Sequence, residues 1–168
     1  MNIFLLDREP KLCAMYHCSV HCIKMILEYC QLLSTAHRVL DGRLIDKRWQ
    51  HSDINKDVIL YKATHINHPS AIWTRQSKAN YLFLFELLSR LSEEYTYRYG
   101  KIHASTCLFD VLKNAPINIS NNALTDVPQC MPDYCKLHDT VEAYRNYYKL
   151  EKRHIAIWKN RDVPYWYD

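Results

Sequence analysis

A chain of 168 residues with 48% hydrophobic residues is long enough to fold around one core and is not typical of a disordered protein. Only two glycines occur, Gly42 and Gly100, which excludes glycine-rich phosphate-binding loops and disfavours turn-rich β-sandwiches and barrels. The formal net charge of +4 is compatible with a polyanionic partner but does not identify one. We therefore expect a mainly α protein, a single compact helical domain over residues 1–168 with a short N-terminal extended segment.

The chain contains no stretch of about 20 apolar residues, so we expect no membrane partner. Its first residues, MNIFLLDREP, lack the basic start and the apolar length of a signal peptide. The seven cysteines are odd in number and include no CxxC pair, which favours reduced thiols over a disulfide framework. We expect a cytoplasmic protein, located in the host cytoplasm if it is viral. Cys18, Cys22 and Cys30 should lie on a buried helix face.

The first half of the chain is dominated by one helical pattern. Residues 2–7 should be extended, and Pro10 suits the first turn of the helix that follows. Apolar residues then recur at helical spacing over residues 11–40, either as one long helix or with a break near His17. Gly42 is expected to end this helix.

The remaining elements are marked by capping residues and by changes of composition. Residues 41–66 are polar and aperiodic, which favours a mobile loop containing a strand or short helix at 57–63. A second helical region opens at Pro69, is capped within by Ser77 and ends at Gly100. The later predictions are a helix over 103–113, a loop over 115–135, a helix over 136–158 and an aromatic tail that packs back on the domain.

Seven polar residues of the first helix recur in alternating steps of four and three, so a continuous helix would place them on one stripe. They are His17, His21, Lys24, Glu28, Gln31, Thr35 and Arg38. The opposite face is apolar and should be core, so the stripe faces either solvent or a cleft. Two histidines one turn apart, followed by a lysine and a glutamate, favour the wall of an active-site cleft over an ordinary solvated face.

Three chemistries are compatible with this stripe, and the sequence does not choose among them. His17 and His21 could chelate a metal ion together with a third ligand. The candidate third ligands are Glu28, His65 and His68. Alternatively, His21 and Glu28 act as acid and base. In the third chemistry, Lys24 attacks a sugar or carbonyl carbon as a free amine while Glu28 accepts and donates protons.

Aromatic and basic residues interleave in THINHPSAIWTRQSKANY and again in EYTYRYGKIH, a composition that suits contacts with a nucleotide or a nucleic-acid strand. The alternative is that Trp73 and Tyr81 are core residues and Arg75 is solvated. Further basic residues lie among tyrosines and tryptophans at 143–167, a candidate footprint for DNA or RNA or else a surface helix. The candidate substrate-binding residues are Gln31, His68, Trp73, Arg75, Asn80, Tyr81, Arg98 and Lys101.

Taken in order, these motifs resemble a phage-encoded family often labelled pyrimidine-dimer DNA glycosylase-like. The segments that carry the resemblance are MNIFLLD, YHCSVHCIKMILEYCQLLSTAHR, THINHPSAIWTRQSKANY, EYTYRYGKIH, QCMPDY, AYRNYY and PYW, which together span most of the chain. Similarity to the well-understood phage pyrimidine-dimer glycosylases is limited to the pattern of a polar helix bearing Glu28, a His-led second helix and an aromatic basic tail. In the family we expect an acidic and a basic residue between the two histidines, where this chain has Ser19 and Val20.

The resemblance implies a DNA glycosylase/lyase that flips a base out of the duplex, attacks the sugar with an amine and cuts by β-elimination, without a cofactor or metal. Asn2 disfavours removal of Met1, so the amine would be that of Met1 or Lys24. Glu28 would be the acid/base or the stabiliser of an oxocarbenium ion. His17 and His21 would orient or protonate the substrate. The alternative is a nucleotide-binding protein that sequesters or hydrolyses a nucleotide signal in phage counter-defence.

Overall fold

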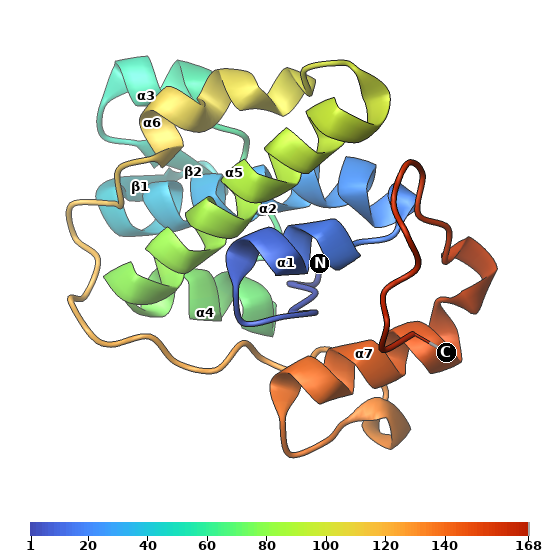
Figure 1. The fold of residues 1–168 in the computed structure, drawn as a ribbon. Coiled ribbons are helices and arrows are strands. Elements are labelled where there is room, and N and C mark those ends of the chain that lie inside the picture. Colours follow the sequence, from blue (N-terminus) through green and yellow to red (C-terminus); the bar gives the residue numbers. More distant parts are fainter. Residues whose placement is uncertain (168) are drawn as a thin grey trace.

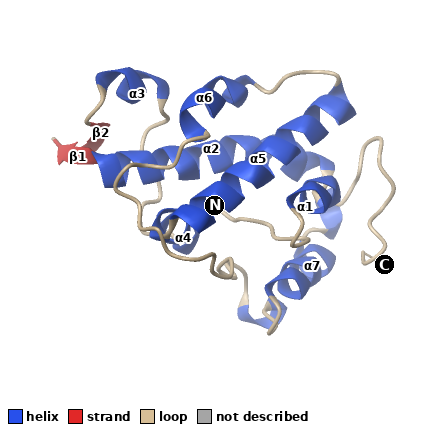
Figure 2. Cartoon of the chain, turned by 60° about the vertical axis from the view of Figure 1, so that its left-hand side comes forward, coloured by secondary structure: helices blue, strands red, loops and turns tan. Residues whose placement is uncertain are grey.

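Helix α2 (Ser19–Asp41) is the central element of the fold. In the computed structural model, which describes residues 1–167, it is crossed by α5 (Lys78–Tyr99), and α4 (Pro69–Gln76) packs against both helices (Figures 1 and 2). Because neighbours cover α2 on several sides, most of its second half is buried, polar residues included. The expected mainly α architecture is confirmed, and the described residues contain one sheet, of two strands.

The long helix predicted over residues 11–40 is two helices, as the alternative reading allowed. α1 (Pro10–Tyr16) has its proline in the first turn, and the backbone is extended at His17 and Cys18 before α2 begins. The end of α1 would leave carbonyl groups without helical partners. Arg98 satisfies two of them, because its guanidinium donates to His17 O and Met15 O at 2.8 Å each.

Residues 42–59 form a hairpin and a short helix, so the region predicted as an aperiodic loop over 41–66 holds more regular structure than expected. Strands β1 (Gly42–Ile45) and β2 (Arg48–His51) pair antiparallel, and α3 (Ile54–Ile59) follows. The hairpin turns at Asp46 and Lys47, which both have positive φ, the geometry of tight two-residue hairpins. Neither residue is a glycine, which is why the usual sequence signal for this turn is missing.

Arg38 ties this region to the core. Its Nε donates to Tyr61 O at 2.7 Å, Nη1 donates to Trp49 O at 3.1 Å, and Nη2 donates to Leu60 O at 2.8 Å. The guanidinium also forms a short ion pair with Asp57. A single buried side chain therefore holds both the hairpin and α3 against α2.

Gly42 ends α2, as predicted, and it also allows the hairpin to approach the helix. A Cβ at this position would lie 2.2 Å from Gln50 O and 2.3 Å from Arg38 O, and both are backbone atoms that cannot move independently. We expect Gly42→Ala to lower the free energy of unfolding by about 1–3 kcal/mol, the usual cost of overpacking. Urea denaturation measures the effect. Gly100→Asn is the matched control, because a Cβ there meets nothing within 4 Å and asparagine tolerates its left-handed φ of 64°.

The second half of the chain follows the predicted caps. Ser77 accepts a hydrogen bond from Asn80 N at the start of α5, and Gly100 ends that helix. The expected helix over 103–113 is a 3-10 turn, η1 (Ala104–Leu108), followed by α6 (Phe109–Leu112). The remaining elements are η2 (Asp133–Cys135), α7 (Thr140–Glu151), which is shorter than predicted, and η3 (Arg153–Ile155).

The two chain ends are built into the core. Residues 2–7 run extended without forming a strand, and Ile3 and Leu6 are fully buried. The aromatic tail packs back as predicted, with the Trp166 ring 5.9 Å from that of Tyr16 and 6.1 Å from that of Tyr148. The three predicted helix-face cysteines, Cys18, Cys22 and Cys30, are all buried. None of the helices within residues 1–167 has the length and apolar character needed to cross a membrane.

Candidate functional site

Only the middle residues of the predicted polar stripe on the first helix are accessible in the structure. His17 lies outside α2, and His21, Thr35 and Arg38 are buried among protein partners. Lys24, Glu28 and Gln31 remain accessible, with the side chain of Lys24 64% exposed and that of Glu28 15% exposed. The stripe fails as a unit because it assumed one solvent-facing side, whereas α2 is covered on several sides.

The two histidines that opened the stripe are buried and already paired. His17 donates from Nδ1 to Cys13 O at 2.7 Å, and its Nε2 lies 3.2 Å from the Tyr29 hydroxyl. His21 bonds the Tyr148 hydroxyl at 2.6 Å and stacks on Phe4. Burial lowers the pKa of His17 to about 4 and that of His21 to about 3, so both rings are neutral at pH 7. Their geometry favours structural roles over the predicted catalytic ones.

The accessible carboxylate of Glu28 lies within a cluster of cationic and titratable groups. Lys24 Nζ is 3.3 Å from Glu28 Oε1. Partial burial lowers the pKa of His68. The positive charges of the Met1 α-ammonium group and of His65 lower this pKa further, whereas the negative charge of Glu28 raises it. The α-amine, His65 and Glu28 thus each act on the charge of His68. We call Met1, Lys24, Glu28, His65 and His68 the Glu28 cluster.

Local sequence features bring the cluster together. His68 caps α4, because its Nδ1 accepts from Ser70 N at 3.2 Å, and Pro69 fits the first turn. Met1 lies beside the same helix end, where Ser70 Oγ donates to Met1 O at 3.5 Å (Figure 2). The extended segment behind Met1 is anchored on α2 by the bond from Phe4 N to the Tyr29 hydroxyl, at 3.3 Å.

Three predicted binding residues on α4 and α5 belong to the core. Tyr81 is fully buried, and its hydroxyl donates to Leu112 O at 2.9 Å. Asn80 is fully buried and uses its amide to hold Trp73 O and the Thr125 backbone. Trp73 is buried and donates from its indole to Thr125 O at 3.2 Å. These contacts occupy groups predicted to bind substrate, and for Trp73 and Tyr81 they correspond to the alternative that both are core residues.

The predicted phosphate ligands differ in accessibility. Arg98 has no exposed side-chain surface and pairs with Glu94, so it cannot contact a phosphate without unfolding. Arg75 is half-buried and donates to Ile66 O at 2.7 Å. Lys101 is exposed just beyond the end of α5. Of the three, only Lys101 is placed as a solvent-facing cation.

The basic tail is also more structural than predicted. The Arg145 guanidinium lies over the rings of Tyr16, Tyr165 and Trp166 and pairs with Asp7. Lys159 lies over the Tyr99 ring. These contacts use charge to hold the C-terminal segment on the domain, so its basic density is a weak argument for a nucleic-acid surface.

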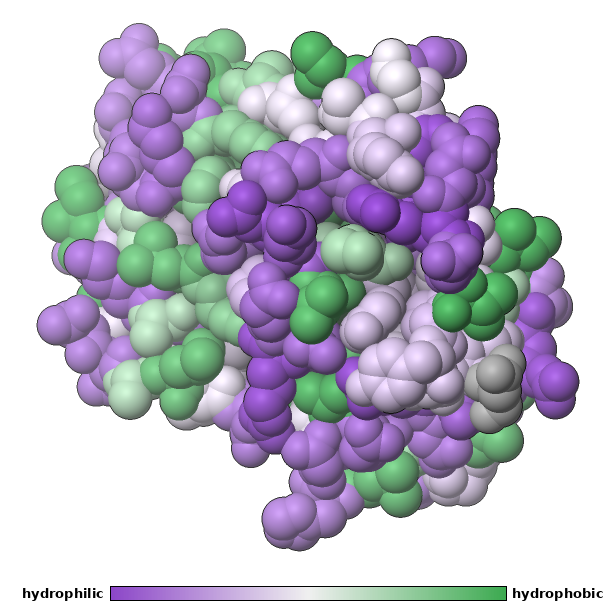
Figure 3. Space-filling model, viewed as in Figure 1, coloured by the Kyte–Doolittle hydropathy of each residue, from purple (hydrophilic) through white to green (hydrophobic). Residues whose placement is uncertain are grey.

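A cationic groove that the sequence did not reveal lies beside the hairpin. It has a volume of about 510 Å³, and its lining includes Lys47, Arg48, Trp49 and Lys62. Ala63 and Ile66 continue the lining toward the segment that carries His65 and His68. The groove was missed because its residues fall in the region predicted to be a loop. Figure 3 shows hydrophilic residues over much of one face, with hydrophobic ones scattered among them.

Comparisons with known proteins do not add a relative. No protein-family model, no curated protein and no solved structure matches the chain. Within residues 1–167, no group of three metal-binding side chains includes His17 or His21, which argues against the metal-binding alternative for the stripe. The interpretation of the site therefore depends on the chemistry of the Glu28 cluster and of the cationic groove.

Proposed function

We propose that this protein is a DNA glycosylase/lyase-like enzyme that acts on the N-glycosidic bond of damaged or modified bases, with Glu28 as its essential carboxylate. One observation carries the proposal: the partly buried Glu28 carboxylate lies 3.3 Å from the Lys24 amine, and both Glu28 and the α-amine of Met1 act on His68. A carboxylate can stabilise the positive charge that develops on the sugar when the base departs. The resemblance to the phage glycosylase-like family supports the same reaction class.

Of the two amines, the α-amine of Met1 is the better nucleophile. The Lys24 side chain is 64% exposed, and its Nζ lies 3.3 Å from Glu28 Oε1. An α-amine has an ordinary pKa of about 7.7–8.0 against about 10.4 for lysine, so a far larger share of it is neutral near pH 7.5. Only a neutral amine has the electron pair needed for attack.

The proposed reaction begins when the neutral amine attacks C1′ of the flipped nucleotide. The C1′–base bond breaks, and the base leaves with the bonding electron pair and takes up a proton. The sugar ring then opens, its oxygen is protonated, and the amine nitrogen loses a proton to form a Schiff base with C1′. β-Elimination removes a proton from C2′ and expels the 3′-phosphate, and water finally hydrolyses the Schiff base to release the amine.

The cationic groove is the proposed path of the DNA backbone toward the Glu28 cluster. Lys47, Arg48 and Lys62 supply positive charge, and Trp49 supplies a ring on which an extruded base can stack. Basic residues interleaved with an aromatic ring are the usual means of holding a strand without reading its sequence.

Borohydride trapping tests the proposal. The protein is incubated with undamaged, ultraviolet-irradiated and modified-base duplexes, and the reduced adduct is digested with trypsin. We expect an adduct on the peptide of residues 1–8 that persists in Lys24→Ala and is lost in Glu28→Gln. Glu86→Gln, which changes an exposed carboxylate on α5, is the control and should trap normally. An adduct on Lys24 would reassign the nucleophile, and no adduct with any duplex would refute the amine mechanism.

Nucleotide binding without turnover is the second candidate, and the size of the groove favours it. A volume of about 510 Å³ is within the usual range for small-ligand sites, about 300–1,000 Å³. Calorimetric titration with mono- and oligonucleotides would reveal it. Tight binding of a nucleotide that is returned unaltered, lost in Arg48→Ala, would favour sequestration over catalysis.

A further inference from the structure

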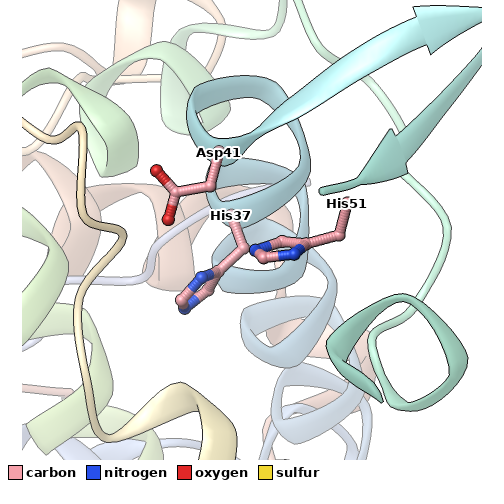
Figure 4. Close-up of side chains that lie close together, drawn as sticks. All are labelled: His37, Asp41 and His51. Atoms are coloured by element: carbon pink, nitrogen blue, oxygen red, sulfur yellow. The ribbon is translucent and has the colours of Figure 1, made fainter. Parts of the chain in front are cut away.

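A second polar cluster lies at the far end of α2, roughly 14 Å along the helix from Glu28 by helical rise. His37 and Asp41 come from the last turns of α2 and His51 comes from the end of β2 (Figure 4). All three are buried, with relative exposures of 0%, 8% and 8%. One donor atom from each lies within 4.8 Å of the other two, the only such trio of metal-binding side chains in residues 1–167.

Two ring nitrogens in this cluster are buried without a partner. His37 Nδ1 and His51 Nε2 make no hydrogen bond. Buried polar atoms are nearly always satisfied, because an unpaired one costs about 1–3 kcal/mol. Two unpaired nitrogens in one small cluster point to a missing ligand between them.

His37 is arranged as a metal ligand would be. Its Nε2 is 3.1 Å from Asn114 O and 2.9 Å from the Tyr81 hydroxyl, which itself donates to Leu112 O. Nε2 therefore carries the ring proton and Nδ1 presents its lone pair. A ligating histidine held through its other nitrogen by a carbonyl is the usual arrangement in metal sites.

The Asp41 carboxylate is oriented by the loop at residues 117–118. Oδ1 accepts from Asn118 N and Nδ2, both at 2.9 Å, and Oδ2 accepts from Ile117 N at 2.7 Å. These bonds leave a lone pair on Oδ2, because each carboxylate oxygen accepts about two bonds. The side chain is fixed in place and still has capacity for a cation.

We propose that His37 Nδ1, His51 Nε2 and Asp41 bind one divalent transition-metal ion, for which Zn²⁺ is the best match. Two imidazoles and one carboxylate form a common zinc ligand set, and a fourth position is left for water or another ligand. A pocket of about 330 Å³ is lined in part by His51, Arg43 and Ser52, so it reaches one of the three proposed ligands. The site is independent of the proposed glycosylase chemistry.

Binding requires a defined local adjustment. Ligand atoms around a tetrahedral Zn²⁺ are about 3.3 Å apart, since each bond is about 2.0–2.1 Å, so the three groups must close in. His51 Nδ1 accepts from Asp53 N at 2.9 Å, which places the ring proton on Nε2 in the metal-free protein. On coordination through Nε2 this proton moves to Nδ1, and the Asp53 amide must turn away. We therefore expect amide exchange at Asp53 to accelerate when Zn²⁺ binds.

Metal titration of the chelator-treated full chain tests the site. For this experiment the substitution Cys107→Ser is introduced into every variant, because it removes an exposed thiol that could bind the metal independently. We expect one Zn²⁺ per chain, a higher melting temperature, and with Co²⁺ a visible spectrum without thiolate charge-transfer bands. Asp41→Asn and His51→Gln should each raise the Kd for Zn²⁺ at least about tenfold. This bound is conservative, because removing even a residue that only hydrogen-bonds to a metal ligand lowers metal affinity about 10- to 100-fold.

The controls separate loss of ligands from loss of the fold. His138→Gln removes an exposed histidine elsewhere and should leave the Kd unchanged. Circular dichroism checks that each variant is folded, and Asp41→Asn alone decides the outcome if His51→Gln unfolds. An unchanged Kd in a folded Asp41→Asn variant, or failure of the parent chain to bind Zn²⁺ at all, would overturn the proposal.

Discussion

Replacing Glu94 by glutamine should lower the free energy of unfolding by about 3–5 kcal/mol, the cost of breaking a buried ion pair by removing one partner. The Glu94 side chain is 5% exposed and accepts from Arg98 Nε at 2.6 Å and from Arg161 Nε and Nη2 at 2.8 Å each. Arg98 in turn holds the end of α1. One carboxylate thus joins α5, the α1–α2 junction and the C-terminal segment, and its loss leaves the buried Arg98 charge without a counterion.

Urea denaturation at pH 7.5 measures this effect. Glu86→Gln is the matched control, because it removes a surface carboxylate of the same helix that pairs with Arg90, and it should change stability little. A Glu94→Gln protein within about 1 kcal/mol of wild type would show that the network is weaker than its burial implies.

The second large effect is a steep loss of stability in mild acid. His17, His21 and His37 are buried as neutral rings, and burial lowers their pKa values to about 4, 3 and 4 respectively. In the unfolded chain each histidine has a pKa of about 6.5, so the unfolded state takes up protons first. Little is lost above pH 7, and at pH 6.5 each histidine has removed only about 0.4 kcal/mol. Below pH 6.5 each histidine removes up to about 1.4 kcal/mol of stability per pH unit until the folded pKa is reached.

Three such histidines together predict a slope of about 4 kcal/mol per pH unit below pH 6. Denaturation at pH 7.5, 6.5 and 5.5 with a chelator present measures the slope without metal binding. His21→Phe keeps the stack on Phe4 and should reduce the slope by about one-third, whereas His138→Gln should leave it unchanged. Equal stability at pH 7.5 and 5.5 would contradict neutral burial of these rings.

The sequence by itself determined the helical class and several helix ends, because those signals are local. A cap or a proline acts within one turn: Pro10 in the first turn of α1, His68 before α4, Ser77 before α5 and Gly100 after it all lie where the sequence placed them. The burial of the helix-face cysteines also followed from periodicity. The α7 boundaries were less accurate, since no strong cap marks the end of that helix.

The tertiary structure alone decided which polar residues are accessible. Helical periodicity identifies residues that share a face, but the burial of that face depends on everything that packs against it. His21 and Arg38 are buried because α2 is central, and of the seven stripe residues only Lys24, Glu28 and Gln31 are accessible. The hairpin at 42–51 depends on the distant bonds of Arg38 and on a turn without glycine.

The two candidate sites arise from the same cause. The Glu28 cluster joins the chain start to α2 and α4, and the trio of His37, Asp41 and His51 joins α2 to β2. Residues of these groups are separated in the sequence by up to 67 positions, as between Met1 and His68. Local preferences do not encode such distances, because only the packing of helices around α2 brings these side chains together.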